Sequence, residues 1–466
     1  MHTLKLAPLA SLVSCTLVNA ATLYQQSPSS QISFAPEPAR FDEYKVVEAC
    51  LTSTEDIRNT MNWIDHQGFD IWKAPTTDTC FHVRVDDRQY TELINHLPVS
   101  STHKVIISNV QSLIDETITQ SMSSNATQAE DFLSHYHKYD EIITFMKNIS
   151  DTYPDLVDLF TIGKTYEGRD IWGITIKSKR AREEPTSVWT EMMPWWNPQA
   201  KKTKKHHKEM ELIMHGGQHA REWVSVAVLT YFIETLTSKY GQDKHITKLV
   251  DTFSWTLIPV MNVDGYIFSH EQNRMWRKNR QPTPFPFCSG IDLNRNWGYE
   301  WNRGGSSANP CSEAYMGPEA FAAVETKLMA DFVASRKHAL MYIDFHSYSQ
   351  LWMTPFGSDC NERPKDEENL EELALGATKA LKAVHGTSFA AGSVCKIIYQ
   401  ASGGSLDWTY AVANVKYSFA VELRDVGRYG FLLPEDQIIP SGEETLAGVL
   451  FAAKFISERE KGNKGH

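Results

Sequence analysis

The sequence predicts two folded domains, a small α+β unit followed by a larger α/β domain. In residues 44–110, strand-like and helix-like patterns follow one another in the order β-α-β-β-α-β. From about residue 130, apolar strand-like runs alternate with longer helical patterns, which is typical of an α/β domain. The length of 466 residues is ample for both domains.

The small unit is predicted to be an antiparallel sheet covered by two helices. Its expected strands are 44–51, 69–74, 80–85 and 104–110, and its expected helices are 55–67 and 88–97. Cys50 and Cys80 fall in neighbouring predicted strands, so they could pair. A helix from Gln111 is expected to lead into the polar stretch 121–125, where we place the linker.

In the larger domain, the expected strands are 171–176, 211–214, 255–260, 339–345 and 417–421. Its expected helices are 223–240, 319–336, 370–384 and a last one after Ser441. Ser441 and Glu444 have the spacing of a capping box, which predicts that helix start. Residues 178–208 read as an insertion whose basic end is expected to be a solvated loop.

The N-terminus reads as a signal peptide over residues 1–20, with an apolar stretch from Leu6 to Val18. This stretch is too short for a membrane anchor, so we expect a secreted, extracellular protein with no membrane contact. Export also fits the cysteines: one of seven lies in the signal, and the remaining six favour disulfides. The sequons at Asn125 and Asn148 could then carry glycans. A net charge of −11 makes nucleic acid an unexpected partner.

The segment after the strand at 211–214 contains a candidate metal site. His219 and Glu222 stand three residues apart, and imidazole nitrogen with carboxylate oxygen suits zinc. This pair alone is a weak signal, because such spacing arises often by chance. A catalytic zinc needs a third protein ligand, and His346 at the end of an apolar strand can supply it. Glu422 ends another such strand.

His219, His346 and Glu422 all follow predicted strands at their C-terminal ends, the edge where open α/β sheets place their sites. A single site explains this shared placement better than three independent chance occurrences do. Further motifs accompany them, and together the chain closely resembles the A/B-type zinc metallocarboxypeptidases, or funnelins, from about Phe132 to Ile456. The matching segments are 165–169, 219–223, 273–278, 292–297, 346–350, 399–405 and 422–425.

The resemblance implies a mixed β-sheet sandwiched between helices, with His219, Glu222 and His346 holding one Zn²⁺ per catalytic domain. It implies that Glu422 acts as general base and then general acid with a zinc-activated water. A structural salt bridge between Glu422 and Arg424 or another cation is the alternative. Arg277 matches the family arginine that polarises the scissile carbonyl and stabilises the oxyanion.

The resemblance further implies how a substrate chain end is held. The matching substrate-binding residues are Arg221, Asn294, Arg295, Ser347, Tyr348 and Tyr399, of which Asn294, Arg295 and Tyr399 correspond to the clamp for the free α-carboxylate. Leu406 stands where B-type enzymes carry an Asp that pairs with a cationic side chain. We therefore expect an A-type preference for aromatic and aliphatic C-termini of peptides and proteins. Asp407 is expected to be structural.

Two disulfides are implied by the same resemblance, Cys288 with Cys311 and Cys360 with Cys395. Residues 21–127 resemble the family's activation prosegment, an antiparallel open sandwich that inhibits its own enzyme, before a catalytic domain at 128–466. We expect a monomeric zymogen. No Lys or Arg lies between Lys104 and Lys138, so the usual trypsin-like activation site is missing. A non-catalytic binding protein on the same fold is the other functional hypothesis.

Overall fold

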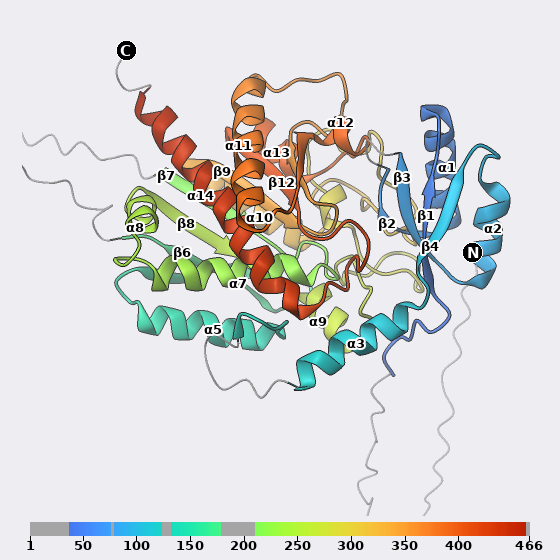
Figure 1. The fold of residues 1–466 in the computed structure, drawn as a ribbon, viewed down its shortest axis with the longest axis horizontal. Coiled ribbons are helices and arrows are strands. Elements are labelled where there is room, and N and C mark those ends of the chain that lie inside the picture. Colours follow the sequence, from blue (N-terminus) through green and yellow to red (C-terminus); the bar gives the residue numbers. More distant parts are fainter. Residues whose placement is uncertain (1–36, 76–78, 124–131, 179–209, 463–466) are drawn as a thin grey trace, which may run out of the picture. The chain divides into compact units, whose positions relative to one another are not determined.

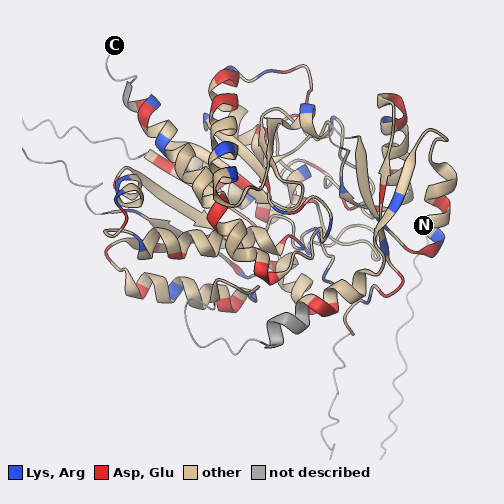
Figure 2. Ribbon diagram, viewed as in Figure 1, with Lys and Arg blue, Asp and Glu red and all other residues tan. Residues whose placement is uncertain are grey.

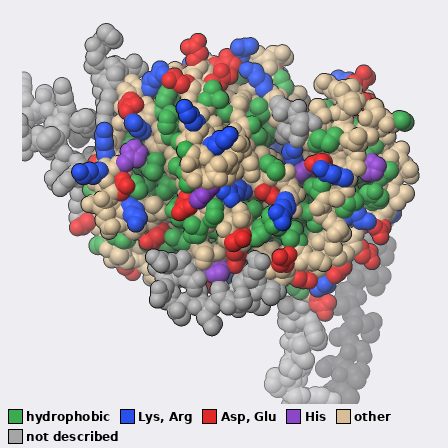
Figure 3. All heavy atoms as spheres, in the orientation of Figure 1, with side chains coloured by type: hydrophobic (Ala, Val, Ile, Leu, Met, Phe, Trp, Pro, Cys, Tyr) green, Lys and Arg blue, Asp and Glu red, His purple; other side chains and the backbone are tan. Residues whose placement is uncertain are grey.

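The computed structural model describes residues 37–75, 79–123, 132–178 and 210–462. The predicted signal peptide, Asn125 and residues 179–208 of the insertion lie outside these ranges, whereas residues 121–123 of the expected linker belong to the helix Val110–Ser123. None of the helices in the described ranges has both the length and the apolar character needed to cross a membrane. Acidic and basic residues are interspersed along the elements in Figure 2, and both signs lie side by side on the face drawn in Figure 3.

The N-terminal unit is a four-stranded antiparallel sheet with the order β2-β3-β1-β4. Its elements are β1 (Lys45–Cys50), α1 (Thr54–Gln67), β2 (Asp70–Lys73), β3 (Cys80–Val85), α2 (Asp87–His96), β4 (Thr102–Ile107) and α3 (Val110–Ser123). The predicted β-α-β-β-α-β order is thus confirmed, and Cys50 is disulfide-bonded to Cys80.

Alternate residues of this sheet serve two different contacts, as the period of a strand requires. Val47 and Ala49 of β1 pack with Ile64 of α1 in the unit's own core. Val46 points the other way, into a cluster that joins the unit to the larger domain. This cluster contains Phe41, Val46, Trp72, Ile107, Val110 and Ile114 together with Met275, Tyr348, Phe431 and Leu432. The N-terminal unit is therefore packed on the larger domain through apolar side chains.

The larger domain is built on an eight-stranded sheet with the order β11-β10-β12-β9-β7-β8-β6-β5. The strands are β5 (Val157–Lys164), β6 (Asp170–Ile176), β7 (Met210–His215), β8 (Phe253–Ile258), β9 (Ala339–His346), β10 (Leu351–Thr354), β11 (Ala390–Ser393) and β12 (Tyr417–Glu422). The central strands β12, β9, β7 and β8 are parallel, whereas β6, β5 and β10 join antiparallel. The predicted mixed sheet is confirmed.

Helices cover this sheet (Figure 1). They are α5 (Tyr139–Thr152), α7 (Trp223–Ser238), α8 (Lys244–Val250), α9 (Val263–Glu271), α10 (Val324–Ser335), α11 (Glu367–His385), α12 (Val394–Ile397), α13 (Ser405–Ala411) and α14 (Ile438–Gly462), with 3₁₀ turns η2 (Leu293–Arg295) and η3 (Glu435–Gln437). Helix α14 packs against α11 and α7, while α10 contacts β5 and α13 contacts β9 and β12. Helix α7 is buried along most of its length, which matches its nearly uniform apolar sequence.

Two predicted helix starts are wrong. Helix α10 begins at Val324 instead of residue 319, because Asn296 accepts hydrogen bonds from the amides of Phe321 and Ala323 and holds the preceding chain in a turn. Helix α14 begins at Ile438, so Ser441 lies inside it and donates to the carbonyl of Gln437. The predicted capping box is therefore absent, and strands β5, β10 and β11 were not predicted at all.

Candidate metal centre and substrate cleft

Three parallel strands bring the predicted site residues to one edge of the sheet. Strand β9 lies between β7 and β12, and Glu422 at the end of β12 is directly opposite His346 at the end of β9. His219 follows β7 by four residues, and Glu222 caps the N-terminus of α7. The expectation that these strand ends meet at one site is confirmed by the parallel register.

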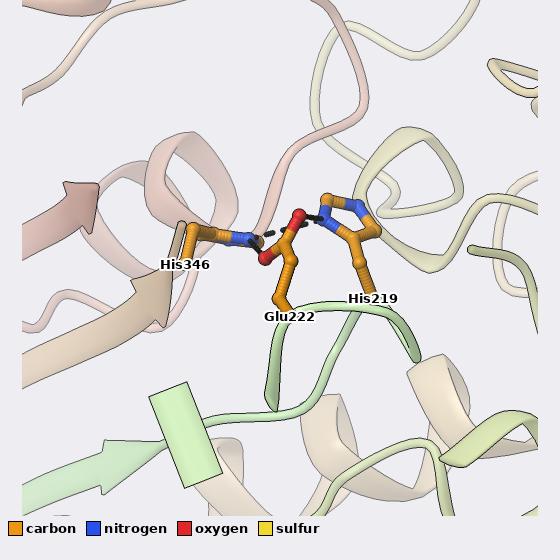
Figure 4. A group of neighbouring side chains, drawn as sticks. All are labelled: His219, Glu222 and His346. Carbon is orange, nitrogen blue, oxygen red and sulfur yellow. Dashed lines mark hydrogen bonds and ion pairs between the residues drawn. The ribbon is translucent and has the colours of Figure 1, made fainter. Parts of the chain in front are cut away.

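His219, Glu222 and His346 converge on one point (Figure 4). Nδ1 of His219 lies 2.8 Å from Oε1 of Glu222, and Nδ1 of His346 lies 2.9 Å from Oε2 of the same carboxylate. The two Nδ1 atoms are 3.1 Å apart, and all three side chains are buried. Two facing imidazole nitrogens and one carboxylate form the donor set that suits a tetrahedral Zn²⁺ site with one open position.

Asp292 supports this cluster from behind, although its role was not predicted from the sequence. Its Oδ1 accepts from Nε2 of His219 at 3.1 Å, and its Oδ2 accepts from Arg277 at 2.9 and 3.2 Å. Burial alone would raise the pKa of Asp292, but Arg277 and His219 hold it well below its usual range. Arg277 is thereby fixed with Nη1 3.8 Å from Oε1 of Glu222, at the border of the metal cluster.

Glu422 lines the same cleft as the three cluster residues and Arg277. Its Oε2 is buried and has no hydrogen-bond partner in the described structure. Burial, and then the nearby carboxylate of Glu222, raise the pKa of Glu422 to about 8 against the lowering effect of His346. A divalent cation beside it would lower this pKa. Arg424 does not pair with Glu422, because Glu444 binds it at 2.7 Å.

The residues predicted to hold the substrate carboxylate, Asn294, Arg295 and Tyr399, line the same cleft. Nη2 of Arg295 lies 3.3 Å from the hydroxyl of Tyr399, and its Nε donates to the carbonyl of Gly305 at 2.7 Å. The amide oxygen of Asn294 accepts from the backbone of Ser405, which turns its Nδ2 toward the metal cluster.

An apolar pocket adjoins this clamp. Leu406 is 4% exposed and packs with Leu351, Met353 and Ala420, next to Val394, Ile397 and Ile398. The neighbouring carboxylate, Asp407, accepts hydrogen bonds from the backbone amides of Gly357 and Ser358 at 2.8 to 3.0 Å. Burial raises the pKa of Asp407 to about 6. Its engagement with the backbone supports the structural role predicted for it.

Residues of the N-terminal unit also line the cleft. Asp70 of β2 binds Nη1 of Arg221 at 2.8 and 3.0 Å, and Arg221 is fully buried between Asp70 and the ring of Phe431. Trp72 packs on Phe431, and the hydroxyl of Tyr348 lies 2.9 Å from Nδ1 of His82. Of the predicted substrate-binding residues, Arg221 and Tyr348 are thus occupied by the N-terminal unit, while Ser347 lines the cleft with a free Oγ.

Comparisons with known proteins agree with this geometry. Residues 142–448 match the family described as zinc carboxypeptidase, and residues 51–117 match the carboxypeptidase activation peptide. The chain belongs to the zinc carboxypeptidase family. Zn²⁺ is therefore its cofactor, and the cluster of His219, Glu222 and His346 is the candidate site for it.

Relatives of this zinc carboxypeptidase include proteins named as carboxypeptidases and proteins named as inactive metallocarboxypeptidases. It is 38% identical to mouse carboxypeptidase A2 over 411 residues, which cover 87% of this chain and 92% of that protein. It is 32% identical over 469 residues to an inactive metallocarboxypeptidase, ecm14 of Talaromyces stipitatus, covering 92% of this chain and 76% of that protein. The crystal structure of thrombin activatable fibrinolysis inhibitor matches with a TM-score of 0.76 at 31% identity, covering 90% and 100% of the two chains.

The zinc carboxypeptidase also contains the two disulfides implied by the resemblance, Cys288 with Cys311 and Cys360 with Cys395. The first of them anchors the segment that carries Ser312, whose hydroxyl donates to Asp65 of the N-terminal unit at 2.7 Å. Asn148 is exposed on α5. Asp70, Asp292 and Asp344 are the functional candidates that sequence reasoning missed. Asp70 and Asp292 contact residues far away in the chain, whereas Asp344 contacts His346 two residues further along the same strand.

Proposed function

We propose that this zinc carboxypeptidase is a secreted, monomeric zymogen that removes aromatic or aliphatic residues from the C-termini of peptides and proteins. The ligands are His219, Glu222 and His346, and the boundaries are those of a signal peptide at 1–20, a prosegment at 21–127 and a catalytic domain at 128–466. Export is supported by the three disulfides, and Asn125 and Asn148 are the proposed glycan sites. The convergence of two histidines and a glutamate beside an unpartnered Glu422 is the observation that carries the proposal.

Glu422 is the proposed general base and then general acid. A bound Zn²⁺ would polarise the scissile carbonyl and activate water. Glu422 would take a proton from that water and pass it to the leaving amine, which its buried, unpartnered Oε2 leaves it free to do. Because Arg424 is bound by Glu444, a structural salt bridge between Glu422 and Arg424 has no support.

Arg277 would stabilise the negative charge that develops on the carbonyl oxygen. Its guanidinium is fixed before substrate arrives, because Asp292 accepts from both Nε and Nη2. Such preorganisation is what makes a fixed positive charge effective in a water-poor site. Asn294, Arg295 and Tyr399 would hold the free α-carboxylate of the substrate, and a guanidinium fork suits that group.

The apolar pocket supports the preference for apolar side chains. A lysine or arginine side chain placed against Leu406, Met353 and Ala420 would be buried without a partner. Leu406→Asp should therefore lower kcat/KM for a peptide ending in Phe by about 10²-fold or more, while raising it for a peptide ending in Arg. Paired peptides that differ only in their last residue measure this change.

Leu375 provides a matched control for that substitution, because it is 61% exposed on α11. Leu375→Asp should leave both kcat/KM values unchanged. An unmodified enzyme that prefers Lys or Arg ends, or a Leu406→Asp variant with the parent's preference, would show that this pocket does not select the substrate.

The N-terminal unit would inhibit the enzyme until it is removed. Asp70 occupies Arg221 with contacts of 2.8 and 3.0 Å across the interface, and both side chains are buried. Breaking a buried ion pair costs about 3–5 kcal/mol, since the remaining charge stays unpaired. In the uncleaved chain, Asp70→Asn should raise basal peptide turnover by about 10-fold or more, as the unit detaches more often.

Asp87→Asn is the control, because Asp87 is an exposed carboxylate of the same unit and is paired only with Lys45 at the surface. It should not change basal turnover. The uncleaved Asp70→Asn chain could instead show the same low turnover as the uncleaved parent, while the same variant is fully active after cleavage. In that case the ion pair between Asp70 and Arg221 would not maintain the inhibited state.

The direct test of the proposal uses protein whose prosegment has been removed at a protease site engineered after residue 127. With zinc bound, it should release Phe or Leu from a peptide and leave the same peptide with a C-terminal amide intact. Tight binding of the peptide without release of its last residue would instead favour a non-catalytic binding protein.

A further inference from the structure

Asp344 is a buried carboxylate directly behind one of the three proposed zinc ligands. It lies on β9 two residues before His346, so both side chains leave the strand on the same face. Its Oδ2 lies 2.8 Å from Nε2 of His346. Nδ1 of the same imidazole faces Glu222 and His219. The ring is therefore held between the ligand cluster on one side and Asp344 on the other.

The position of Asp344 is itself fixed by two other segments. Oγ of Ser405, at the start of α13, donates to Oδ2 at 2.6 Å. Nε2 of Gln218, in the loop after β7, donates to the same oxygen at 2.9 Å. Asp344 is fully buried, so these bonds offset the loss of water around its charge. Because Asp344 is held in this way, it can fix the direction of the hydrogen bond that its Oδ2 accepts from Nε2 of His346.

The two histidines of the cluster have different supports. The carboxylate behind His219 is Asp292, whose charge is balanced by Arg277 at 2.9 Å. Among the described residues, no Lys or Arg forms an ion pair with Asp344, whose polar neighbours are Ser405, Gln218 and His215. Asp344 therefore presents a less compensated negative charge to His346 than Asp292 presents to His219.

We propose that Asp344 is a positioning residue that fixes the orientation and the Nε2-protonated form of His346 and thereby strengthens zinc binding. A neutral imidazole that binds a metal through Nδ1 carries its proton on Nε2. Asp344 Oδ2 is the nearest acceptor for that proton; the other neighbour of Nε2, Nδ2 of Asn294, lies at 3.3 Å and is itself a donor. The inference rests on the ligand role proposed for His346.

Asp344→Asn tests this in the full-length chain, because asparagine keeps the size of the side chain and removes its charge. Zinc affinity, measured by competition with a chromogenic chelator, should fall by about 10- to 100-fold. The rise in melting temperature on adding zinc should shrink accordingly, since stabilisation by a ligand depends on its affinity. Neither readout depends on turnover.

Asp407→Asn is the matched control, because Asp407 is an equally buried aspartate whose partners are backbone amides and not a zinc ligand. It should change stability without changing zinc affinity. If Asp344→Asn did not fold, Ser405→Ala would remove one bond that holds Asp344 and should still weaken zinc binding several-fold. Unchanged zinc affinity in Asp344→Asn, or in Ser405→Ala where only that variant folds, would overturn the proposal.

His346→Ala in the same assay separates this inference from the one on which it rests. If His346→Ala binds zinc as tightly as the parent, the ligand assignment fails. If His346→Ala loses zinc while Asp344→Asn does not, only the role of Asp344 fails.

Discussion

Glu422→Gln should lower kcat by about 10²- to 10⁴-fold in zinc-loaded protein without its prosegment, because a carboxamide can neither take nor return a proton. The change is nearly isosteric, and Oε2 of Glu422 has no partner to lose within the described structure. KM and zinc content should therefore stay close to those of the parent. Steady-state kinetics on a peptide ending in Phe, with metal analysis of the same sample, measure all three quantities.

Glu443→Gln is a suitable control for that variant. Glu443 is a partly exposed carboxylate of α14 whose partner is His385, away from the cleft. Its substitution should leave kcat unchanged. A Glu422→Gln enzyme that kept the parent's kcat would remove Glu422 from the chemistry, whereas a fall in kcat explained by lost zinc would make its role structural.

His219→Ala should abolish both zinc binding and turnover. The substitution removes one of three protein donors and leaves Glu222 and His346 to hold the metal alone. Changes to residues behind a metal ligand typically cost 10- to 100-fold in affinity, so we expect loss of a ligand itself to cost more than about 100-fold. Metal analysis after gel filtration and the rate of Phe release from a peptide measure the two effects.

His385→Ala controls for the loss of a histidine, because His385 is a surface residue at the end of α11. Its zinc content and turnover should match those of the parent. Retention of one tightly bound zinc by His219→Ala would mean that the metal is held by a different set of residues.

The parts of the fold that could be predicted from the sequence are those where a local pattern decides the structure. The strands of the N-terminal unit and the central parallel strands have continuous or alternating apolar residues, and their predicted bounds agree with the structure within a few residues. Strand β5 alternates only weakly between buried and exposed positions, and β10 and β11 have four residues each. Such strands are defined by their neighbours in the sheet more than by their own sequence.

The wrong helix starts have a similar cause. Ser441 and Glu444 have the spacing of a capping box, but Glu444 is bound by Arg424 from another segment, and the helix continues three residues further back. Glu444 thus forms an ion pair with Arg424 instead of the capping interaction that the local pattern predicts for the start of the helix. The start of α10 is likewise set by Asn296, from 27 positions before Ala323.

The site could be predicted wherever a residue acts on substrate or metal within a motif. Asp292 and Asp70 were missed because their partners His219 and Arg221 lie 73 and 151 positions away. Asp344 stands only two residues before His346, and the alternation of side chains along a strand, which places both on one face, is the signal that could have revealed it. The sequence does show that no Lys or Arg occurs at 105–137, which leaves cleavage by another class of protease or no release of the N-terminal unit.

The central claim is that one zinc ion at His219, Glu222 and His346 makes this chain a carboxypeptidase. The most direct measurement is a zinc titration of metal-free protein without its prosegment, followed by release of the last residue from a peptide ending in Phe. Release should rise in proportion to added zinc and reach its maximum at one zinc per chain. Release that does not depend on zinc, or no release at full zinc occupancy, would contradict the proposed zinc-dependent carboxypeptidase activity.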